Sequence, residues 1–137
     1  IEEIIAANRA TGGEAAWRFI HADYTTALDL PDDGFDLLVS LYAGFVSEHC
    51  TRHLKRGGNL LVHPSHGDVA MASIDPRYQL VAVVQSRAGD YQVYDRALDA
   101  YLRPKRDVKV TKEMLRETRR GVGYTTSPFA YLFRRIR

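Results

Sequence analysis

The chain has 137 residues, of which 45% are hydrophobic and 26% are charged, and its formal net charge at pH 7 is +2. These values indicate one globular domain that is long enough to bury a core, and no stretch approaches the roughly 20 apolar residues of a membrane span. No signal peptide is recognisable and the single cysteine, Cys50, cannot form an internal disulfide, so we expect a cytoplasmic protein that contacts no membrane.

The charges are distributed unevenly along the chain. Residues 1 to 104 carry 9 basic and 14 acidic side chains, a net charge of −5, whereas residues 105 to 137 carry 10 basic and 3 acidic side chains, a net charge of +7. The C-terminal segment is therefore the only electrostatic candidate for an anionic partner.

The first expected element is a helix with isoleucines 1, 4 and 5 on one face, ended by Gly12 and Gly13. Two apolar runs follow, residues 17 to 22 and residues 35 to 42, and both are predicted to be buried strands. Ligands bind at the carboxyl ends of strands in an open α/β sheet. The residues that we expect to share one rim of the sheet on this ground are Asp23, Tyr24, Ser40 and Tyr42.

The middle of the chain predicts an amphipathic helix over residues 44 to 56, because Val46, Cys50 and Leu54 recur at intervals of four and place Cys50 in the core. A short strand from Asn59 to His63 follows the pair Gly57 and Gly58. Residues 67 to 74 are predicted to form a helix that ends before Asp75-Pro76.

The C-terminal part begins with the clearest strand signal, residues 78 to 85, which are rich in β-branched side chains. Helices are predicted over residues 91 to 102 and over residues 111 to 120, the second with Thr111 as its N-cap. The segment from Gly121 to Gly123 is predicted to be a turn, because no strand precedes it. A last strand is expected over residues 129 to 136.

Four features in this order resemble the middle and C-terminal part of the class I S-adenosylmethionine-dependent methyltransferases. They are the strand end Ala22-Asp23, the strand that begins Phe35-Asp36, the following helix, and the sequence from Leu54 to Gly58 before the next strand. The resemblance implies an α/β fold with a Rossmann-like sheet, mostly parallel with an antiparallel C-terminal strand that pairs with residues 78 to 85, and with helices on both faces.

The family's glycine-rich donor loop and its first strands are absent from this sequence. Residues 1 to 137 therefore read as a single partial methyltransferase-like domain, with a small helical insertion around residues 90 to 120. Without the first strand, residues 17 to 22 would lack a sheet neighbour, so we expect either upstream residues or a partner that supplies them.

The resemblance implies methyl transfer from S-adenosyl-L-methionine to a small-molecule acceptor, with S-adenosyl-L-homocysteine as the product. It assigns Asp23 to the adenine amino group, the backbone N–H of Tyr24 to the same ring, and Ser40 and Leu41 to the region of the transferring methyl group. The alternative role for Asp23 is to cap the turn that begins at Thr25.

The acceptor is expected beside the same rim. The residues predicted to contact it are Tyr42, His63, Tyr91 and Tyr94. His63 or His66 can act as a general base, because the pKa of histidine lies near neutrality. The alternatives are a polar loop capped by Ser65 and tyrosines that only pack a helix onto the sheet.

Two further patterns carry less weight. His49 and His53 are spaced i, i+4, but no third ligand accompanies them and no metal is predicted. Arginines and lysines along one side of a helix either contact phosphates or lie in solvent, and we favour solvent, which makes a nucleic-acid partner an open alternative. These basic residues are Lys112, Arg116, Arg119 and Arg120.

Two other functions are compatible with the pattern. One is a non-catalytic, methyltransferase-like binding or scaffold subunit. The other is an NAD(P)-dependent oxidoreductase, which is disfavoured because the chain has no recognisable glycine-rich fingerprint and no downstream catalytic Tyr/Lys pair. The sequence alone identifies neither the acceptor atom nor the oligomeric state.

Overall fold

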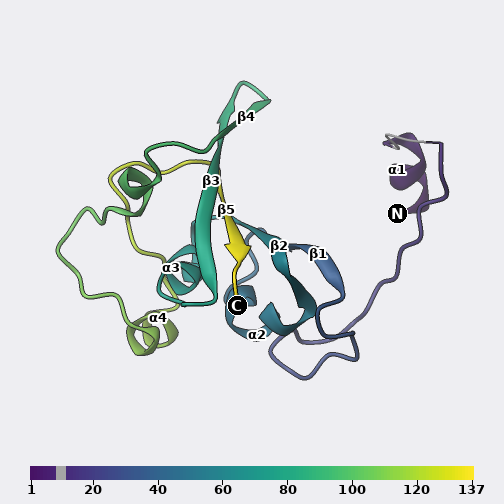
Figure 1. The fold of residues 1–137 in the computed structure, drawn as a ribbon, viewed down its shortest axis with the longest axis horizontal. Helices are drawn as coiled ribbons and strands as arrows, with labels where there is room; N and C mark the ends of the chain where they lie inside the picture. Colours follow the sequence, from purple (N-terminus) through teal and green to yellow (C-terminus); the bar gives the residue numbers. More distant parts are fainter. Residues whose placement is uncertain (9–11) are drawn as a thin grey trace.

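The computed structural model describes residues 1–8 and 12–137, and these are organised around a five-stranded sheet (Figure 1). The strand order in the sheet is β1-β2-β5-β3-β4. The strands are β1 (Phe35–Ser40), β2 (Leu54–Val62), β3 (Tyr78–Arg87), β4 (Asp90–Tyr94) and β5 (Ala130–Arg135). The last strand of the chain therefore lies at the centre of the sheet.

Strand β5 lies between β2 and β3 and is antiparallel to both. Phe133 on β5 is opposite Leu60 on one side and Leu80 on the other. The predicted antiparallel pairing of the last strand with residues 78 to 85 is therefore confirmed. Strands β3 and β4 form a hairpin through Ala88 and Gly89, both of which have positive φ, as a two-residue hairpin turn requires.

The predicted fold class is wrong. Of the four strand pairings only β1–β2 is parallel, so the sheet is mostly antiparallel rather than a mostly parallel Rossmann-like sheet. Helices do not cover both faces either. The side chains of Phe35, Leu37 and Val39 alternate along β1 and are 41%, 52% and 49% exposed, so no helix of residues 1–8 and 12–137 covers that face of β1. The protein is a small mixed α/β domain.

The helices are short. They are α1 (Glu2–Ala7), α2 (Val46–His49), α3 (Asp68–Ser73) and α4 (Lys112–Thr118), with single 3-10 turns at Thr51–His53, Ser65–Gly67 and Leu98–Leu102. The predictions of α3 and α4 are confirmed, and the Thr111 hydroxyl caps α4 by accepting from the Met114 backbone N–H at 3.2 Å. No helix in the described part of the chain is long and apolar enough to span a bilayer.

The helix predicted over residues 44 to 56 ends early. Its i, i+4 pattern is real for Val46 and Cys50, which are both buried, but the chain is extended from Leu54 onward. Leu54 pairs with Phe35, and the ladder resumes only at Asn59, so residues 55 to 58 form an irregularity in β2. Gly57, with φ +81°, supplies the backbone conformation that this irregularity needs.

The helix predicted over residues 91 to 102 is also wrong. Its first part is strand β4, and its second part is the 3-10 turn Leu98–Leu102. The tight turn at Ala88 and Gly89 returns the chain directly onto the edge of β3, where residues 91 to 94 gain backbone partners. The predicted helical insertion around residues 90 to 120 thus contains a strand, a 3-10 turn and α4.

The N-terminal segment lies apart from the sheet (Figure 1). The predicted helix is present, but it ends at Ala7, where the Asn8 side chain donates to the Ile4 carbonyl at 2.8 Å, before the predicted stop at glycines 12 and 13. The predicted strand over residues 17 to 22 is absent, because this segment has no partner strand in the described residues and Phe19 is 71% exposed. The question of its sheet neighbour therefore does not arise, because residues 17 to 22 do not form a strand.

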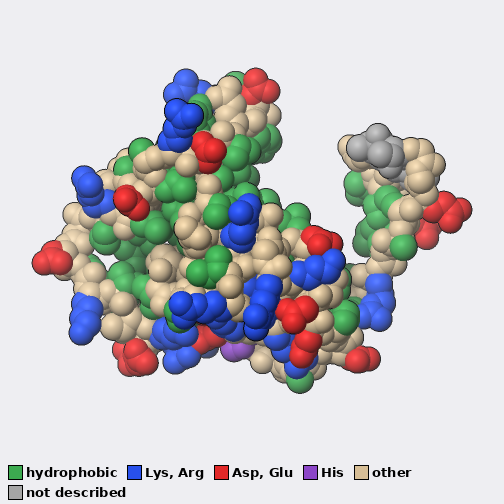
Figure 2. Space-filling view, in the orientation of Figure 1, with side chains coloured by type: hydrophobic (Ala, Val, Ile, Leu, Met, Phe, Trp, Pro, Cys, Tyr) green, Lys and Arg blue, Asp and Glu red, His purple; other side chains and the backbone are tan. Residues whose placement is uncertain are grey.

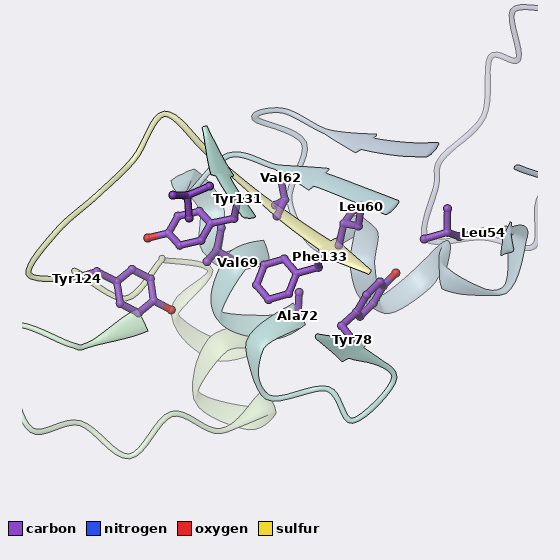
Figure 3. Close-up of a cluster of buried hydrophobic side chains, with 10 residues drawn as sticks. Leu54, Leu60, Val62, Val69, Ala72, Tyr78, Tyr124, Tyr131 and Phe133 are labelled. Carbon is purple, nitrogen blue, oxygen red and sulfur yellow. The ribbon is translucent and has the colours of Figure 1, made fainter. Parts of the chain in front are cut away.

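The core fills the space between β5 and α3, and Figure 3 shows its side chains pointing toward one another. Phe133 is 1% exposed, and its ring lies 6.3 Å from that of Tyr78 and 6.4 Å from that of Tyr131. A second cluster joins α4 to α3 through buried Leu115 and Met71. This packing fixes α4 beside the carboxyl ends of β1 and β2.

Candidate functional site

A cavity of about 980 Å³ lies beyond the carboxyl ends of β1 and β2. Its walls come from the turn at residues 23 to 25, the loop at residues 42 to 45, α2 and the end of α4. The lining residues are Asp23, Tyr24, Thr25, Tyr42, Ala43, Gly44, Phe45, Glu48, His49, His66, Arg116 and Arg119. A volume of this size accommodates a cofactor-sized ligand.

Asp23 begins a hydrogen-bonded turn in the cavity wall. Its Oδ1 accepts from the Thr25 backbone N–H at 2.9 Å and from the Thr25 hydroxyl at 2.8 Å. These hydrogen bonds hold the pKa of Asp23 below its ordinary value, so the carboxylate is ionised at neutral pH. Asp23 therefore caps the turn, which was the alternative role, and also lines the cavity.

The Tyr24 side chain is positioned by the backbone of Gly44. Gly44 has φ +93°, and a Cβ at that position would lie 2.5 Å from the Tyr24 hydroxyl oxygen. Only glycine therefore meets both demands, the left-handed backbone and the close approach of the phenol. The Tyr24 ring also meets the His49 ring edge-on at 5.9 Å, and burial raises the pKa of Tyr24 above its ordinary value.

An ion pair between α2 and α4 forms one side of the cavity. The Arg116 guanidinium donates to Glu48, with Nε 3.1 Å from Oε1, and this hydrogen bond lowers the pKa of Glu48. Sequence reasoning missed Glu48. The two partners are 68 residues apart, and no local pattern links them.

The predicted basic face does not act as a single surface. Lys112 lies 3.9 Å from the Asp75 carboxylate and Arg116 is paired with Glu48, whereas Arg119 lines the cavity and Arg120 lies outside it. Figure 2 shows the same mixing, with acidic side chains between the Lys and Arg side chains along the lower part of the molecule. Arg116 and Arg119 both line the cavity. Of these two, Arg119 has no acidic partner among the described residues.

Tyr42 is held against His63. Its backbone has φ +61°, its hydroxyl oxygen lies 3.0 Å from His63 Nε2, and the two rings stack at 4.1 Å. The Ser65 backbone N–H donates to His63 Nδ1 at 3.1 Å, so Nδ1 is an acceptor and the proton of the neutral ring is on Nε2. Burial, followed by the charge of His66, lowers the pKa of His63.

An aromatic row continues from this pair toward the β3–β4 hairpin. The His63 ring meets Phe129 edge-on at 5.7 Å, and Phe129 meets Tyr91 edge-on at 5.2 Å. Tyr42, His63, Phe129 and Tyr91 thus form a continuous series of rings beside the cavity. Sequence reasoning named three of these four residues and missed Phe129.

The structure brings together some predicted site residues and separates others. Asp23, Tyr24, Tyr42 and His66 line the cavity, whereas Ser40 and Leu41 do not. Ser40 is 1% exposed, and its hydroxyl donates to Asp68 Oδ2 at 2.5 Å. Tyr94 lies on the exposed hairpin, where its hydroxyl donates to Gln92.

Asp68 is a buried carboxyl group that sequence reasoning missed. It is 1% exposed, and besides Ser40 it accepts from the backbone N–H of Ser47 at 3.1 Å and from the Ser47 hydroxyl at 2.5 Å. It therefore ties the end of β1 to the start of α2, directly beneath the loop at residues 42 to 45.

The two histidines of the helical pair point to different surroundings. His49 lines the cavity, while His53 Nδ1 lies 3.1 Å from the Pro31 carbonyl oxygen. In the described part of the chain, no three His, Cys, Asp or Glu side chains gather in a way that could hold a metal ion.

Comparison with known proteins gives no relative: no family model matches the chain, and neither a curated protein nor a solved structure resembles it significantly.

Proposed function

We propose that the protein binds S-adenosyl-L-methionine in the cavity between Asp23 and Arg119 and transfers its methyl group to a small-molecule acceptor. One observation carries the proposal: Asp23, Tyr24 and Tyr42, which the family resemblance assigns to cofactor and acceptor, line the same cavity although they come from two separate loops. The acceptor lies along the row of aromatic rings that begins at Tyr42.

The lining residues suit the parts of this cofactor. The Asp23 carboxylate is ionised, and its Oδ2 remains available to accept from an exocyclic amino group. Tyr24 offers apolar ring surface to a nucleoside. Arg119, without an acidic partner in the described residues, can bind a carboxylate.

Methyl transfer requires positioning more than activation. The cofactor supplies a methyl group on a sulfonium; the carbon–sulfur bond breaks with its electron pair moving to sulfur while the acceptor forms its new bond to carbon. The protein's contribution is to fix the acceptor in line. Tyr42 is suited to this role, because stacking and a hydrogen bond to His63 fix its ring.

The proton released by the acceptor goes to His66 in this proposal. His66 lines the cavity and is exposed, so its ring nitrogens are accessible. Both nitrogens of His63 are instead engaged, one by Ser65 and the other by Tyr42. Of the two candidate bases, His66 is therefore the one that the geometry favours, and His63 positions Tyr42.

The first test is isothermal titration calorimetry with S-adenosyl-L-methionine and S-adenosyl-L-homocysteine. Asp23→Asn is expected to weaken binding roughly tenfold, because it removes the charge that accepts from the amino group. Asp29→Asn, an exposed acid outside the cavity, is the matched control and should bind as the wild type does. The proposal would be overturned if S-adenosyl-L-methionine and S-adenosyl-L-homocysteine both failed to bind.

The alternatives give distinct results in the same experiments. A non-catalytic binding subunit predicts cofactor binding without formation of S-adenosyl-L-homocysteine from any acceptor. An oxidoreductase predicts that NADH binds and that its fluorescence changes, while S-adenosyl-L-methionine gives no heat.

For catalysis, His66→Gln is expected to lower kcat by roughly a hundredfold, the usual contribution of a general base, without changing the Kd of the cofactor. His63→Gln should mainly raise KM, because it releases Tyr42. The assignment of His66 is wrong if the two variants affect kcat equally.

A further inference from the structure

A second pocket, of about 380 Å³, lies on the other side of α4 from the cofactor cavity. Its walls are the segment from Pro104 to Val108, the face of α4 that carries Met114, and the segment from Arg120 to Gly123. Arg119 lines the first cavity and Arg120 the second, so the end of α4 separates the two.

The walls of this pocket are held in a defined arrangement. The Lys105 backbone N–H donates to the Gly123 carbonyl at 2.8 Å, and the Thr125 backbone N–H donates to the Arg103 carbonyl at 2.9 Å. Met114 and Val122 pack against the buried cluster that joins α4 to α3. The segment that the sequence predicted as a turn, Gly121 to Gly123, therefore serves as a wall of the pocket.

The lining combines an apolar interior with a cationic rim. Pro104, Val108, Met114 and Val122 supply aliphatic surface, and no aromatic ring of the described part of the chain lines the pocket. Three cations border it, and in the described residues none of them forms an ion pair. They are Lys105, Arg106 and Arg120.

Among the residues that the structure describes, no acidic side chain lines the pocket. Asp107 is absent from the lining, although its two chain neighbours, Arg106 and Val108, are part of it. Unpaired cations at the edge of an aliphatic hollow attract an anion whose body is apolar, since the chain is desolvated in the hollow while the charge stays at the rim.

We propose that this pocket binds an aliphatic anion, namely an apolar chain that ends in a carboxylate. The chain lies between Val108, Met114 and Val122, and the carboxylate pairs with Arg120 and Lys105. The absence of aromatic lining favours a flexible aliphatic chain over a planar ring, which would gain no stacking there.

Octanoate is the ligand used in the test, in titrations of the full chain by isothermal titration calorimetry. Saturable binding to one site is expected, and octanol and octylamine should bind at least roughly tenfold more weakly, because neither presents a negative charge to the rim. Equal affinity for octanol would overturn the role of the cations.

Two pairs of variants locate the site. Gly123→Val should abolish binding, because a side chain there enters the pocket; its Cβ would have only Lys105 Cδ nearby, at 3.8 Å, so the fold tolerates it. Gly13→Val, in open space, is the control. Arg120→Gln should weaken binding roughly fivefold while its neighbour Arg119→Gln leaves it unchanged.

The variant pairs also decide the proposal when a variant fails to fold. If Gly123→Val lacks a cooperative thermal transition, the Arg119 and Arg120 variants locate the site without it. Octanoate binding that depends on Arg119 rather than Arg120 would place the anion in the first cavity and overturn the proposal. Displacement of octanoate by S-adenosyl-L-methionine would do the same.

Discussion

Replacement of Asp68 by alanine is expected to lower the free energy of unfolding by about 3 kcal/mol. The carboxyl group accepts hydrogen bonds from the Ser40 hydroxyl and from both the backbone N–H and the hydroxyl of Ser47, and all three residues are 1% exposed. Alanine leaves these donors buried without an acceptor. Urea denaturation measures the loss, and Asp36→Ala, which removes an exposed acid on strand β1, is the control.

Asp68 also gives the stability a defined pH dependence. Burial raises the pKa of Asp68, against the opposing effect of its hydrogen bonds from Ser40 and Ser47. Because the folded-state pKa lies above the unfolded value of 3.8, this group stabilises the fold when protonated, and that contribution is lost as pH rises through the folded-state pKa.

Asp75 acts in the opposite direction. Burial raises its pKa, but the Arg77 hydrogen bonds outweigh burial and hold the pKa below 3.8, so its contribution is lost as pH falls. Asp75 is present both in the wild type and in Asp68→Asn, so the difference in stability between these two proteins reports Asp68 alone. The stability of the wild type relative to that variant should decrease from pH 4 upward, and a difference that is constant or increases with pH would contradict the assignment.

The strands predicted over residues 35 to 42, 59 to 63, 78 to 85 and 129 to 136 are all present, with shifted ends. Residues 78 to 85 and 129 to 136 form β3 and β5, and their antiparallel pairing was predicted correctly. The pattern could not show that β5 would occupy the centre of a mostly antiparallel sheet. Strand order depends on contacts between distant residues, such as Leu60 with Phe133, which a single sequence does not reveal.

The two wrong helix predictions, over residues 44 to 56 and 91 to 102, have local causes. Val93, Tyr94, Leu98 and Tyr101 recur at a helical spacing. The left-handed turn at Ala88 and Gly89 instead returns Val93 and Tyr94 to the edge of β3, where they form a strand. The i, i+4 pattern of Val46, Cys50 and Leu54 predicted a helix that extends beyond the true end of α2 at His49. The backbone is already extended at Leu54, and Gly57, with positive φ, lies in the irregular part of β2.

Asp23, Tyr24 and Tyr42 line one cavity, although the elements that carry them differ from those predicted. Asp23 and Tyr42 were placed on one rim because each follows an apolar run, yet the first run is not a strand in the structure. They meet because the Tyr24 ring lies against Gly44 in the loop that follows β1. The Glu48–Arg116 pair, by contrast, depends on packing between α2 and α4 and left no sequence signal.

Replacement of Phe133 by alanine is expected to lower the free energy of unfolding by about 3 to 5 kcal/mol, the usual cost of removing a fully buried aromatic ring. Phe133 lies on the central strand β5 and faces the rings of Tyr78 and Tyr131 (Figure 3). The strands on either side are fixed by hydrogen bonds along β5, so the walls of the resulting cavity collapse only in part.

The measurement is a thermal melt followed by circular dichroism. A loss of this size lowers Tm by at least about 10 °C in a domain of this length. Ile136→Ala is the matched control, because Ile136 follows β5 directly and is 46% exposed, so its removal should change Tm only slightly. If the two variants melted alike, the ring of Phe133 would not lie in a packed core, and the central position of β5 would be wrong. Retention of ligand binding by folded Phe133→Ala at low temperature would further show that the cavity beyond β1 and β2 depends on the loops that line it rather than on this ring.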